Sequence, residues 1–302
     1  MRPWRALALV GAAWILVVAC SAQGVTVTAT PPSGSAESDT GTAEPDDGTA
    51  GPSNPRRALE PDLTIVAHRG SANGNVSENG LPALLHASNL GADMVEFDVR
   101  PTLDRRLVVM HDGGLARTSD CHGQVWARTL ADIQADCRLG DGSWVPSFDE
   151  YVDLARRQKM PLMIELKAGP GWSPEALEQM RDLLGPMAQR KGSVFLSFDE
   201  DLLDLAHDAM PRIPGIWIVP RGLSSSGSRS RAVLNKATGG FLVDGDLTSR
   251  AWVRTAHEQG QLVYGRVVDT TMGWQRCRHI GLDGVLSNDL VGFLAWRTLL
   301  TE

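Results

Sequence analysis

Short apolar runs rich in β-branched residues alternate with amphipathic helical patterns from Leu63 to the end of the chain. This alternation leaves few folds open, because strands that are separated by helices pair in parallel. The predicted strands are Thr64–His68, Met94–Val99, Leu162–Lys167, Val194–Phe198, Ile213–Val219, Phe241–Asp244, Leu262–Val267 and Gly284–Ser287. The predicted helices are Pro82–Leu90, Ser173–Arg190, Glu200–Ala209, Arg231–Lys236, Ser249–Gln259, Met272–His279 and Asp289–Leu300. Eight strands with helices between them, over about 240 residues, are typical of an α/β TIM (β/α)8 barrel, with a doubly wound open sheet as the main alternative.

One further apolar run, Leu107–His111, lies too close to the strand at Met94–Val99 for a crossover helix. Two parallel strands need a dozen or more connecting residues, so this pair is predicted to be an antiparallel hairpin that turns near Asp104. The hairpin places Asp98 opposite or nearly opposite His111. Residues 113–159 then become a small insertion after the second barrel strand.

The first residues have the features of an export signal. Arg2 and Arg5 precede an apolar run that is short for a membrane span, and Val17-Val18-Ala19-Cys20 ends it with small residues. This tetrapeptide resembles the bacterial lipobox, which implies a lipoprotein signal peptide at 1–19, lipidation of Cys20 and a lipid-anchored protein of the cell envelope. An ordinary secretory signal and an uncleaved anchor helix are the alternatives.

The stretch from residue 20 to about residue 60 consists mostly of Ser, Thr, Gly, Pro, Ala and acidic residues. It has too few apolar side chains to offset the entropy of ordering, so we predict a disordered tether over 20–60. A folded domain is predicted over 61–302.

The cysteines of the folded part suggest a disulfide. Cys121 and Cys137 lie in one short segment, and an exported chain permits a bridge between them. Cys277 is left over and is predicted to be a buried thiol.

The charge of the chain restricts its partners. The formal net charge is −7, and no long basic run supplies the surface that nucleic-acid binding needs. Nucleic acid is therefore not a predicted partner. An acidic protein that acts on a phosphate ester needs a local cation at its site.

Acidic side chains interrupt the second and third barrel strands. Glu96 and Asp98 are spaced by two on one strand and therefore face the same side, and Glu165 lies on the next strand. In a TIM barrel the carboxyl ends of the strands share one mouth, so we expect these carboxylates to converge. Three oxygen ligands suit one hard divalent cation, Ca²⁺ or Mg²⁺. The alternative is that the acids form salt bridges with Arg69, Arg100 or Lys167.

Two histidines lie at the predicted strand ends. Cleavage of a phosphodiester needs one group to activate the nucleophile and another to protonate the leaving alkoxide, and His68 and His111 are the predicted pair. We expect His68 to be the acid and His111 the base, an order that one sequence leaves open. Arg69 and Lys167 are predicted to bind the substrate phosphate.

An ordered set of runs between Ile65 and Lys167 resembles the glycerophosphodiester phosphodiesterases. The runs are Ala67-His68-Arg69-Gly70, Glu78-Asn79, Gly91-Ala92-Asp93, Glu96-Phe97-Asp98-Val99, Val108-Val109-Met110-His111-Asp112, Arg117-Thr118, Pro146-Ser147-Phe148-Asp149-Glu150 and Ile164-Glu165-Leu166-Lys167. The resemblance implies a TIM barrel, a cation held by Glu96, Asp98 and Glu165, and His68 and His111 as acid and base. Glu78 is given a supporting role. The implied products are glycerol 3-phosphate and an alcohol such as choline, ethanolamine or glycerol, formed through a cyclic phosphate that water opens.

Several positions depart from that family. Gly80 replaces a threonine that would cap the following helix, and Asp104-Arg105 replaces an Asp-Gly turn. Two late runs differ more. Gly265-Arg266-Val267-Val268-Asp269 stands where the family has Trp-Thr-Val-Asn, and Ser287-Asn288-Asp289-Leu290 stands where it has Thr-Asp-x-Pro. These late positions are expected to contact the substrate alcohol.

The sequence leaves two rival functions open. A related barrel phospholipase, of the sphingomyelinase D or phosphatidylinositol-specific phospholipase C type, would act on lipid or lysolipid, with Trp126 and Trp144 as its candidate membrane contacts. A catalytically inactive envelope binding lipoprotein is the other alternative, and the altered late runs are its only support.

Overall fold

The structure is a computed structural model that describes residues 62–70, 75–185, 192–224, 232–233 and 238–300. The chain divides into two units, Met1–Pro52 and Ser53–Glu302, and the description below concerns the second. The predicted signal peptide, Cys20 and the tether lie outside the described residues, as does most of the predicted helix Arg231–Lys236. Within the described part, no helix is both long enough and apolar enough to cross a membrane.

Eight parallel strands close into the predicted barrel. They are β1 (Thr64–Ala67), β2 (Met94–Pro101), β4 (Leu162–Leu166), β5 (Val194–Ser197), β6 (Gly215–Ile218), β7 (Gly240–Val243), β8 (Leu262–Gly265) and β9 (Gly284–Ser287). Their order is β1-β9-β8-β7-β6-β5-β4-β2, and pairing of β1 with β2 closes the ring. The TIM-barrel fold is thus confirmed, and the open sheet is excluded by the β1–β2 pairing.

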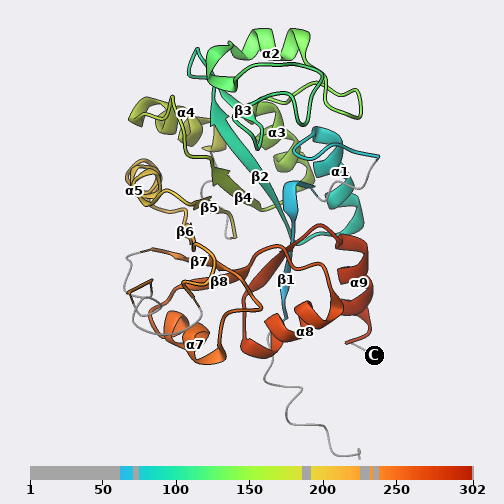
Figure 1. Ribbon diagram of the computed structural model, residues 1–302, viewed down its shortest axis with the longest axis vertical. Coiled ribbons are helices and arrows are strands. Elements are labelled where there is room, and N and C mark those ends of the chain that lie inside the picture. The colour runs from blue at the N-terminus through green and yellow to red at the C-terminus, as the bar shows by residue number, and fades with distance from the viewer. Residues whose placement is uncertain (1–61, 71–74, 186–191, 225–231, 234–237, 301–302) are drawn as a thin grey trace, which may run out of the picture. The chain divides into compact units, whose positions relative to one another are not determined.

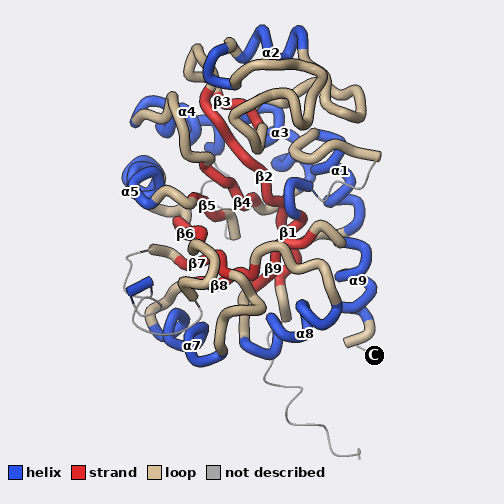
Figure 2. Tube along the Cα trace, viewed as in Figure 1, coloured by secondary structure: helices blue, strands red, loops and turns tan. Residues whose placement is uncertain are grey.

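The helices surround this ring, as Figure 2 shows. They are α1 (Leu81–Leu90), α3 (Phe148–Gln158), α4 (Pro174–Leu184), α5 (Glu200–Ala209), α7 (Arg250–Glu258), α8 (Thr271–Ile280) and α9 (Leu290–Thr298). Side chains on the inner faces of the strands, such as Met163 and Leu286, form one buried cluster, and outward side chains such as Phe97 pack against the helices in another. The helix predicted over Ser173–Arg190 ends at Leu184, because Gly185 takes a positive φ of 46° that stops it.

The predicted hairpin is present. β3 (Leu107–Val109) pairs antiparallel with β2, and Val99 lies opposite Val109. The backbone N–H of Met110 donates to the carbonyl of Asp98 at 3.0 Å, so Asp98 lies opposite Met110 and one residue from His111. Arg105 holds the turn at a φ of 56°, the left-handed conformation that the usual glycine adopts more easily.

The segment after the hairpin packs on a small core of its own. It contains η3 (Val125–Ala127) and α2 (Leu130–Asp136), which lies beyond β3 and outside the ring of strands in Figure 1. The range 113–159 also includes α3, which packs against α1 and α4 and therefore belongs to the outer ring of the barrel. The part that is additional to the barrel thus ends before Phe148. The capping box of Ser147 and Glu150 fixes that boundary.

Cys121 and Cys137 form a disulfide with their Cα atoms 5.3 Å apart, as predicted. Arg128 lies against both sulfur atoms, with Nη1 at 3.5 Å from each. Cys277 is a buried free thiol whose pKa is raised to about 12 by burial.

We expect reduction of the Cys121–Cys137 bond to loosen the insertion and leave the barrel folded. A bridge between residues 16 apart removes about 3 kcal/mol of chain entropy from the unfolded state, and the insertion core is separate from the barrel core. Hydrogen exchange of the Cys121→Ser/Cys137→Ser variant should show faster exchange in α2 and unchanged exchange in β4 and β5. Free thiols at both positions in the unreduced protein, or a barrel that unfolds with the insertion, would contradict this.

Candidate active site

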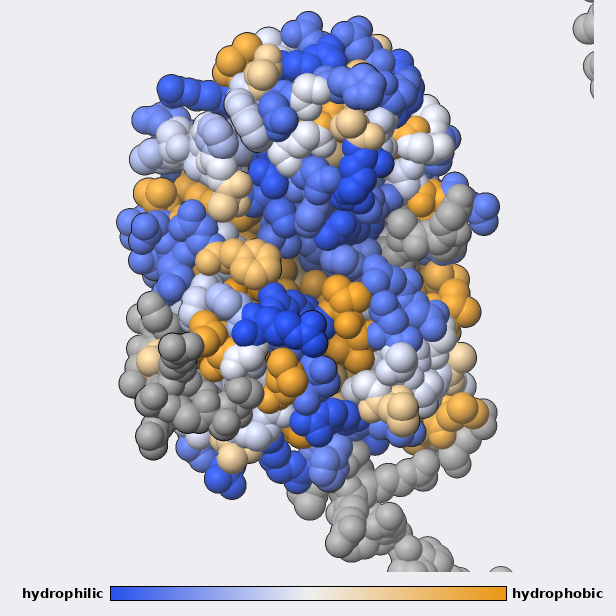
Figure 3. Space-filling view, in the orientation of Figure 1, coloured by the Kyte–Doolittle hydropathy of each residue, from blue (hydrophilic) through white to orange (hydrophobic). Residues whose placement is uncertain are grey.

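The predicted site residues meet at the carboxyl ends of the early barrel strands. His68 directly follows β1, Glu96 and Asp98 lie on β2, and Glu165 lies on β4. In register, Asp98 pairs with Glu165, so these two carboxylates start from neighbouring positions of adjacent strands. On the face seen in Figure 3, hydrophilic side chains gather near the centre, over the barrel. The convergence that was expected from strand ends is therefore present.

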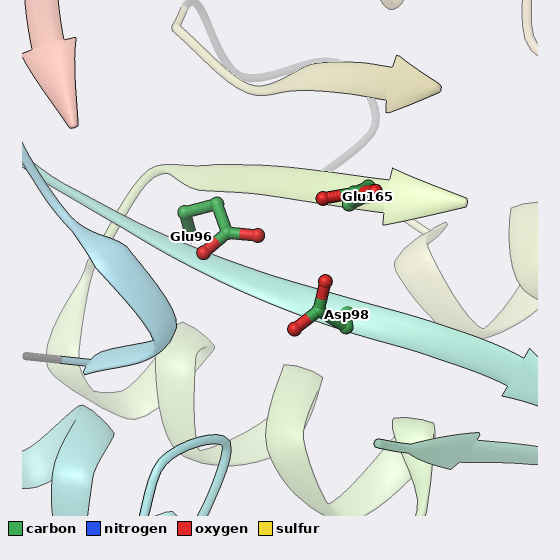
Figure 4. Close-up of side chains that lie close together, drawn as sticks. All are labelled: Glu96, Asp98 and Glu165. Carbon is green, nitrogen blue, oxygen red and sulfur yellow. The ribbon is translucent and has the colours of Figure 1, made fainter. Parts of the chain in front are cut away.

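The three carboxylates form one compact group. Glu96 and Asp98 project from the same side of β2 toward Glu165 on β4 (Figure 4), and one oxygen of each lies within 4.8 Å of the others. Glu96 is 1% exposed and Asp98 is fully buried. Burial and the charges of Asp98 and Glu165 raise the pKa of Glu96 well above its usual value, and burial and Asp98 raise the pKa of Glu165 to about 7. A cation between the three would remove this repulsion.

The donor set fits a hard divalent cation. Asp98 Oδ1 is buried and accepts no hydrogen bond from any described residue, although buried carboxylate oxygens normally have a partner. All three ligands are carboxylates, which suits calcium or magnesium better than zinc. Glu96, Asp98 and Glu165 are thus the residues that can hold the ion.

Salt bridges account for only part of this negative charge. Lys167 Nζ lies 2.7 Å from Glu165 Oε1 and 3.4 Å from Asp98 Oδ1, and Arg69 Nε lies 3.4 Å from Asp98 Oδ2. Burial alone would raise the pKa of Asp98, but the charges of Lys167, His111 and Arg69 lower it overall. Arg100, another expected partner, donates instead to the carbonyls of His111 and Ala168. Two cationic side chains therefore face three carboxylates.

Arg69 is held in an uncommon backbone conformation. Its φ of 52° and ψ of 31° lie in the left-handed region, within the short turn η2 (His68–Gly70) that follows β1. In this conformation the backbone N–H of Arg69 donates to Glu96 Oε2 at 2.8 Å. The turn thereby orients one carboxylate of the group, and Arg69 Nη1 donates to Glu78 Oε1 at 3.0 Å. Such strain is concentrated at functional sites.

His68 lies between the carboxylates and the end of β9. Its Nδ1 is 2.8 Å from Asn288 Oδ1, and its Nε2 is 4.0 Å from Glu96 Oε2. Burial lowers the pKa of His68 more than the hydrogen bond with Asn288 raises it. The ring is therefore mainly neutral near pH 7 and presents Nε2 to the site.

His111 is held by a different set of residues. Its Nδ1 lies 2.5 Å from Asp112 Oδ1, and burial outweighs the nearby charge of Asp98 to lower the pKa of His111. Arg117 comes from the insertion, donates to Asp112, and binds both oxygens of Glu78 at 2.9 and 2.6 Å. A hydrogen bond from Arg117 lowers the pKa of Asp112 to about 2. Glu78 thus links Arg69 to Arg117.

Sequence reasoning assigned no role to several residues that hold the site together. Asn79 is buried, donates to Asp98 Oδ2 at 2.8 Å and accepts from the Asp98 backbone at 3.1 Å. Asp112 and Arg117 position His111, and Asn288 contacts His68. Asn79, Asp112 and Arg117 lie in the runs that resemble the family, and this position was the sequence feature that could have indicated a role for them. Their contacts depend on segments that are distant in sequence.

The departures from the family have visible structural effects. Gly80 is the N-cap of α1 and makes no side-chain cap, as expected. Arg266 pairs with Asp244 and stacks over the exposed ring of Phe198, 5.6 Å from its centroid. Asp269 and Asn288, from the two altered late runs, form hydrogen bonds with each other.

We expect the metal-free protein to lose stability as the pH rises from about 4.5 to about 7. The pKa of Glu165 is about 7 in the folded chain against 4.5 ordinarily, so the folded state binds more protons than the unfolded state in this window. Glu165 accounts for at most about 3 kcal/mol of this loss, and Glu96, whose pKa is also raised, destabilises the folded state in the same direction. Thermal unfolding with a chelator should show it, and Ca²⁺ or Mg²⁺ should raise the Tm more at pH 8 than at pH 5.

The Glu165→Gln variant is the matched control for this pH dependence. It has no proton to lose, so its metal-free Tm should vary less between pH 5 and pH 8. An equal decrease in both proteins would show that Glu165 is not the source.

Comparisons with known proteins agree with this geometry. Residues 68–291 match the sequence model of the glycerophosphoryl diester phosphodiesterase family. A glycerophosphodiester phosphodiesterase of Bacillus subtilis (strain 168) is 28% identical over 254 residues, which cover 76% of this chain and 85% of that relative. One of Bacillus altitudinis is 32% identical over 160 residues, which cover 49% of this chain and 63% of that relative.

Solved structures show the same fold. A phosphodiesterase of Oleispira antarctica, in complex with the product sn-glycerol-3-phosphate, has a TM-score of 0.67 and 22% identity, covering 79% of this chain and 97% of that one. A glycerophosphodiester phosphodiesterase of Parabacteroides distasonis has a TM-score of 0.67 and 20% identity, covering 80% and 100%. At this level of identity the likeness supports the barrel and does not assign individual residues.

Proposed function

Since the chain belongs to the glycerophosphoryl diester phosphodiesterase family, we propose that it hydrolyses glycerophosphodiesters to glycerol 3-phosphate and an alcohol, with one divalent cation and a pair of histidines. The observation that carries the proposal is the buried group of Glu96, Asp98 and Glu165, with His68 beside it and His111 after the adjacent hairpin. A barrel without this chemistry would have no physical reason to bury three like charges at its mouth.

The charged side chains of the site would bind the cation and the substrate phosphate. Glu96, Asp98 and Glu165 would hold the cation, which supplies Lewis-acid polarisation of the phosphate when bound. Arg69 and Lys167 lie at the same carboxylates and would bind the phosphate oxygens through their donor groups. Their positive charge offsets negative charge that develops in the transition state.

The two histidines would pass the protons. One takes the proton of the attacking glycerol hydroxyl as its oxygen bonds to phosphorus, and the other gives a proton to the alkoxide as its bond to phosphorus breaks. This step yields the free alcohol and a cyclic phosphate. Water then opens the ring with the proton transfers reversed, leaving glycerol 3-phosphate and both histidines in their starting states.

A substrate panel tests the proposed activity. Glycerophosphocholine, glycerophosphoethanolamine and glycerophosphoglycerol should each be assayed with Ca²⁺ and with Mg²⁺, and glycerol 3-phosphate should be measured directly. Release of glycerol 3-phosphate with the matching alcohol supports the proposal. Release of phosphocholine in place of choline, or binding of all three without turnover, would overturn it, and the second outcome would favour the binding lipoprotein.

Hydrolysis of lysolipid is the second candidate, and two exposed tryptophans favour it. Trp126 and Trp144 of the insertion are 38% and 49% exposed and lie outside the insertion core. Tryptophan is common at membrane–water interfaces. Assays of lysophosphatidylcholine vesicles beside glycerophosphocholine separate the two functions, and loss of only the vesicle activity in Trp126→Ala/Trp144→Ala would assign these residues to lipid contact.

We also propose that the protein is exported and anchored in the bacterial envelope through a lipid on Cys20. The support is the sequence Val17-Val18-Ala19-Cys20 after an apolar run, followed by a polar stretch that reaches the barrel. On this proposal 1–19 is the signal peptide, 20–60 the tether and 61–302 the catalytic domain. Incorporation of labelled palmitate that is lost in Cys20→Ala would support it, and labelling that persists in the variant would refute it.

A further inference from the structure

The two altered late runs meet in a chain of hydrogen bonds that ends on His68. Asn288 Nδ2 donates to Asp269 Oδ2 at 2.9 Å, and His68 Nδ1 lies 2.8 Å from Asn288 Oδ1. Asp269 is itself fixed, because its Oδ1 accepts from Ser287 Oγ at 2.8 Å and from the backbone N–H of Asn288 at 2.7 Å. The side chain of Asn288 therefore bridges the two residues, with Nδ2 toward Asp269 and Oδ1 toward His68.

The chemistry of these groups determines where the protons lie. Burial alone would raise the pKa of Asp269, but hydrogen bonds from Asn288 and Ser287 lower it overall, so Asp269 is a carboxylate that only accepts. The amide NH₂ of Asn288 must then face Asp269, which leaves the carbonyl Oδ1 to face His68. Since that oxygen also only accepts, Nδ1 of His68 must carry a hydrogen.

We propose that Asn288 and Asp269 are positioning residues that keep neutral His68 in the Nδ1–H tautomer, so that Nε2 is the atom that exchanges a proton with the substrate. Nε2 is also the ring atom on the side of the carboxylates, 4.0 Å from Glu96 Oε2. With a hydrogen fixed on Nδ1, Nε2 carries the lone pair when His68 is neutral and the transferable proton when His68 acts as the acid. The catalytic meaning of this inference rests on the proposed function, and the tautomer itself does not.

The acid at position 269 and the amide at position 288 can be exchanged without loss of their hydrogen bonds. An amide at position 269 and an acid at position 288 would keep every one of these hydrogen bonds, because the amide oxygen accepts from Ser287 Oγ and the backbone while its NH₂ donates to the acid. The exchange is therefore expected to be tolerated as a pair.

A single substitution at Asp269 should change the tautomer of His68, although Asp269 contacts His68 only through Asn288. In Asp269→Asn the acceptor that orients Asn288 becomes an amide that can turn either way, so Asn288 is free to present its NH₂ to His68 and favour the Nε2–H form. Asn288→Leu removes the acceptor altogether. We expect either change to lower kcat about 10-fold while KM changes less than about 2-fold, as for other residues that orient catalytic groups. Asp269→Asn/Asn288→Asp should restore kcat.

The tautomer is measured by the ¹⁵N shifts of His68 in the full chain, loaded with Ca²⁺ or Mg²⁺ at about pH 8 and assigned through His68→Gln. The inference predicts a protonated Nδ1 in the wild type, loss of that signal in Asp269→Asn and Asn288→Leu, and its return in the paired exchange. Asp199→Asn is the matched control, because Asp199 also caps a helix that follows a barrel strand, and its carboxylate accepts from the backbone N–H of Leu202 in α5. The tautomer of His68 and the kcat should both stay unchanged in this control variant.

The outcomes separate this inference from the proposed function. An Nε2–H wild type, or a folded paired exchange that restores neither tautomer nor kcat, overturns the positioning role. The NMR measurement of the tautomer does not require turnover. A protein that is inactive on glycerophosphodiesters but shows the predicted tautomer pattern would therefore contradict only the proposed function.

Discussion

Removal of the divalent cation is expected to abolish hydrolysis, and so is replacement of any one of its three ligands. Glu96→Gln, Asp98→Asn and Glu165→Gln keep the side-chain shape but each removes one negative charge from a buried group. Polarisation of a phosphate by a metal contributes several kcal/mol to the transition state, so a rate loss of about 10³-fold or more is expected. Calorimetric titration with Ca²⁺ and Mg²⁺ should show weakened binding in each variant, with kcat measured on the same protein.

The control for the ligand variants is Glu175→Gln. Glu175 is a fully exposed acid in the first turn of α4, so its loss should leave metal binding and kcat unchanged. Full activity in excess chelator would show that the carboxylate group is not a metal site. Restoration of chelated protein by one cation and not by the other would identify the ion.

Replacement of His68 or His111 by Ala is expected to lower kcat by about 10²–10⁴ and to leave metal affinity nearly intact. Neither histidine belongs to the three-carboxylate group, and both present a ring held at Nδ1 by a partner, Asn288 or Asp112. The double variant should be little worse than the worse single variant, because both proton transfers belong to one step.

A nitrophenyl ester assigns the two histidines. Its leaving group needs no proton, so loss of the general acid should be largely rescued on it, and loss of the base should not. Rescue of His68→Ala would support the order expected from the sequence, with His68 as the acid. Near-normal rates of both single variants on natural and activated substrates alike would contradict the catalytic assignment of the pair.

The sequence by itself determined the parallel pairing of the strands, the hairpin and the grouping of the acidic residues, whereas closure of the sheet into a barrel was decided by the pairing of β1 with β2. Strands and helices alternate at a spacing that only parallel pairing satisfies, and β2 and β3 are too close for anything but a hairpin. Glu96 and Asp98 must share a face because side chains alternate along a strand, and Glu165 must join them because strand ends converge in a closed barrel. These conclusions rest on local periodicity and connection length, which are properties of the chain.

Only the tertiary structure decided which groups hold these residues in place. Asn288 reaches His68 across 220 positions because β9 pairs with β1, and Arg117 joins Asp112 to Glu78 because the insertion folds back over the β1–α1 loop. The left-handed turn at Arg69, which aims its N–H at Glu96, likewise appears only once β1 and β2 are side by side. A hydrogen bond between distant segments forms only when its angle is suitable and its distance is correct to within a few tenths of an ångström. Barrel closure sets these distances and angles, and residue type and spacing do not.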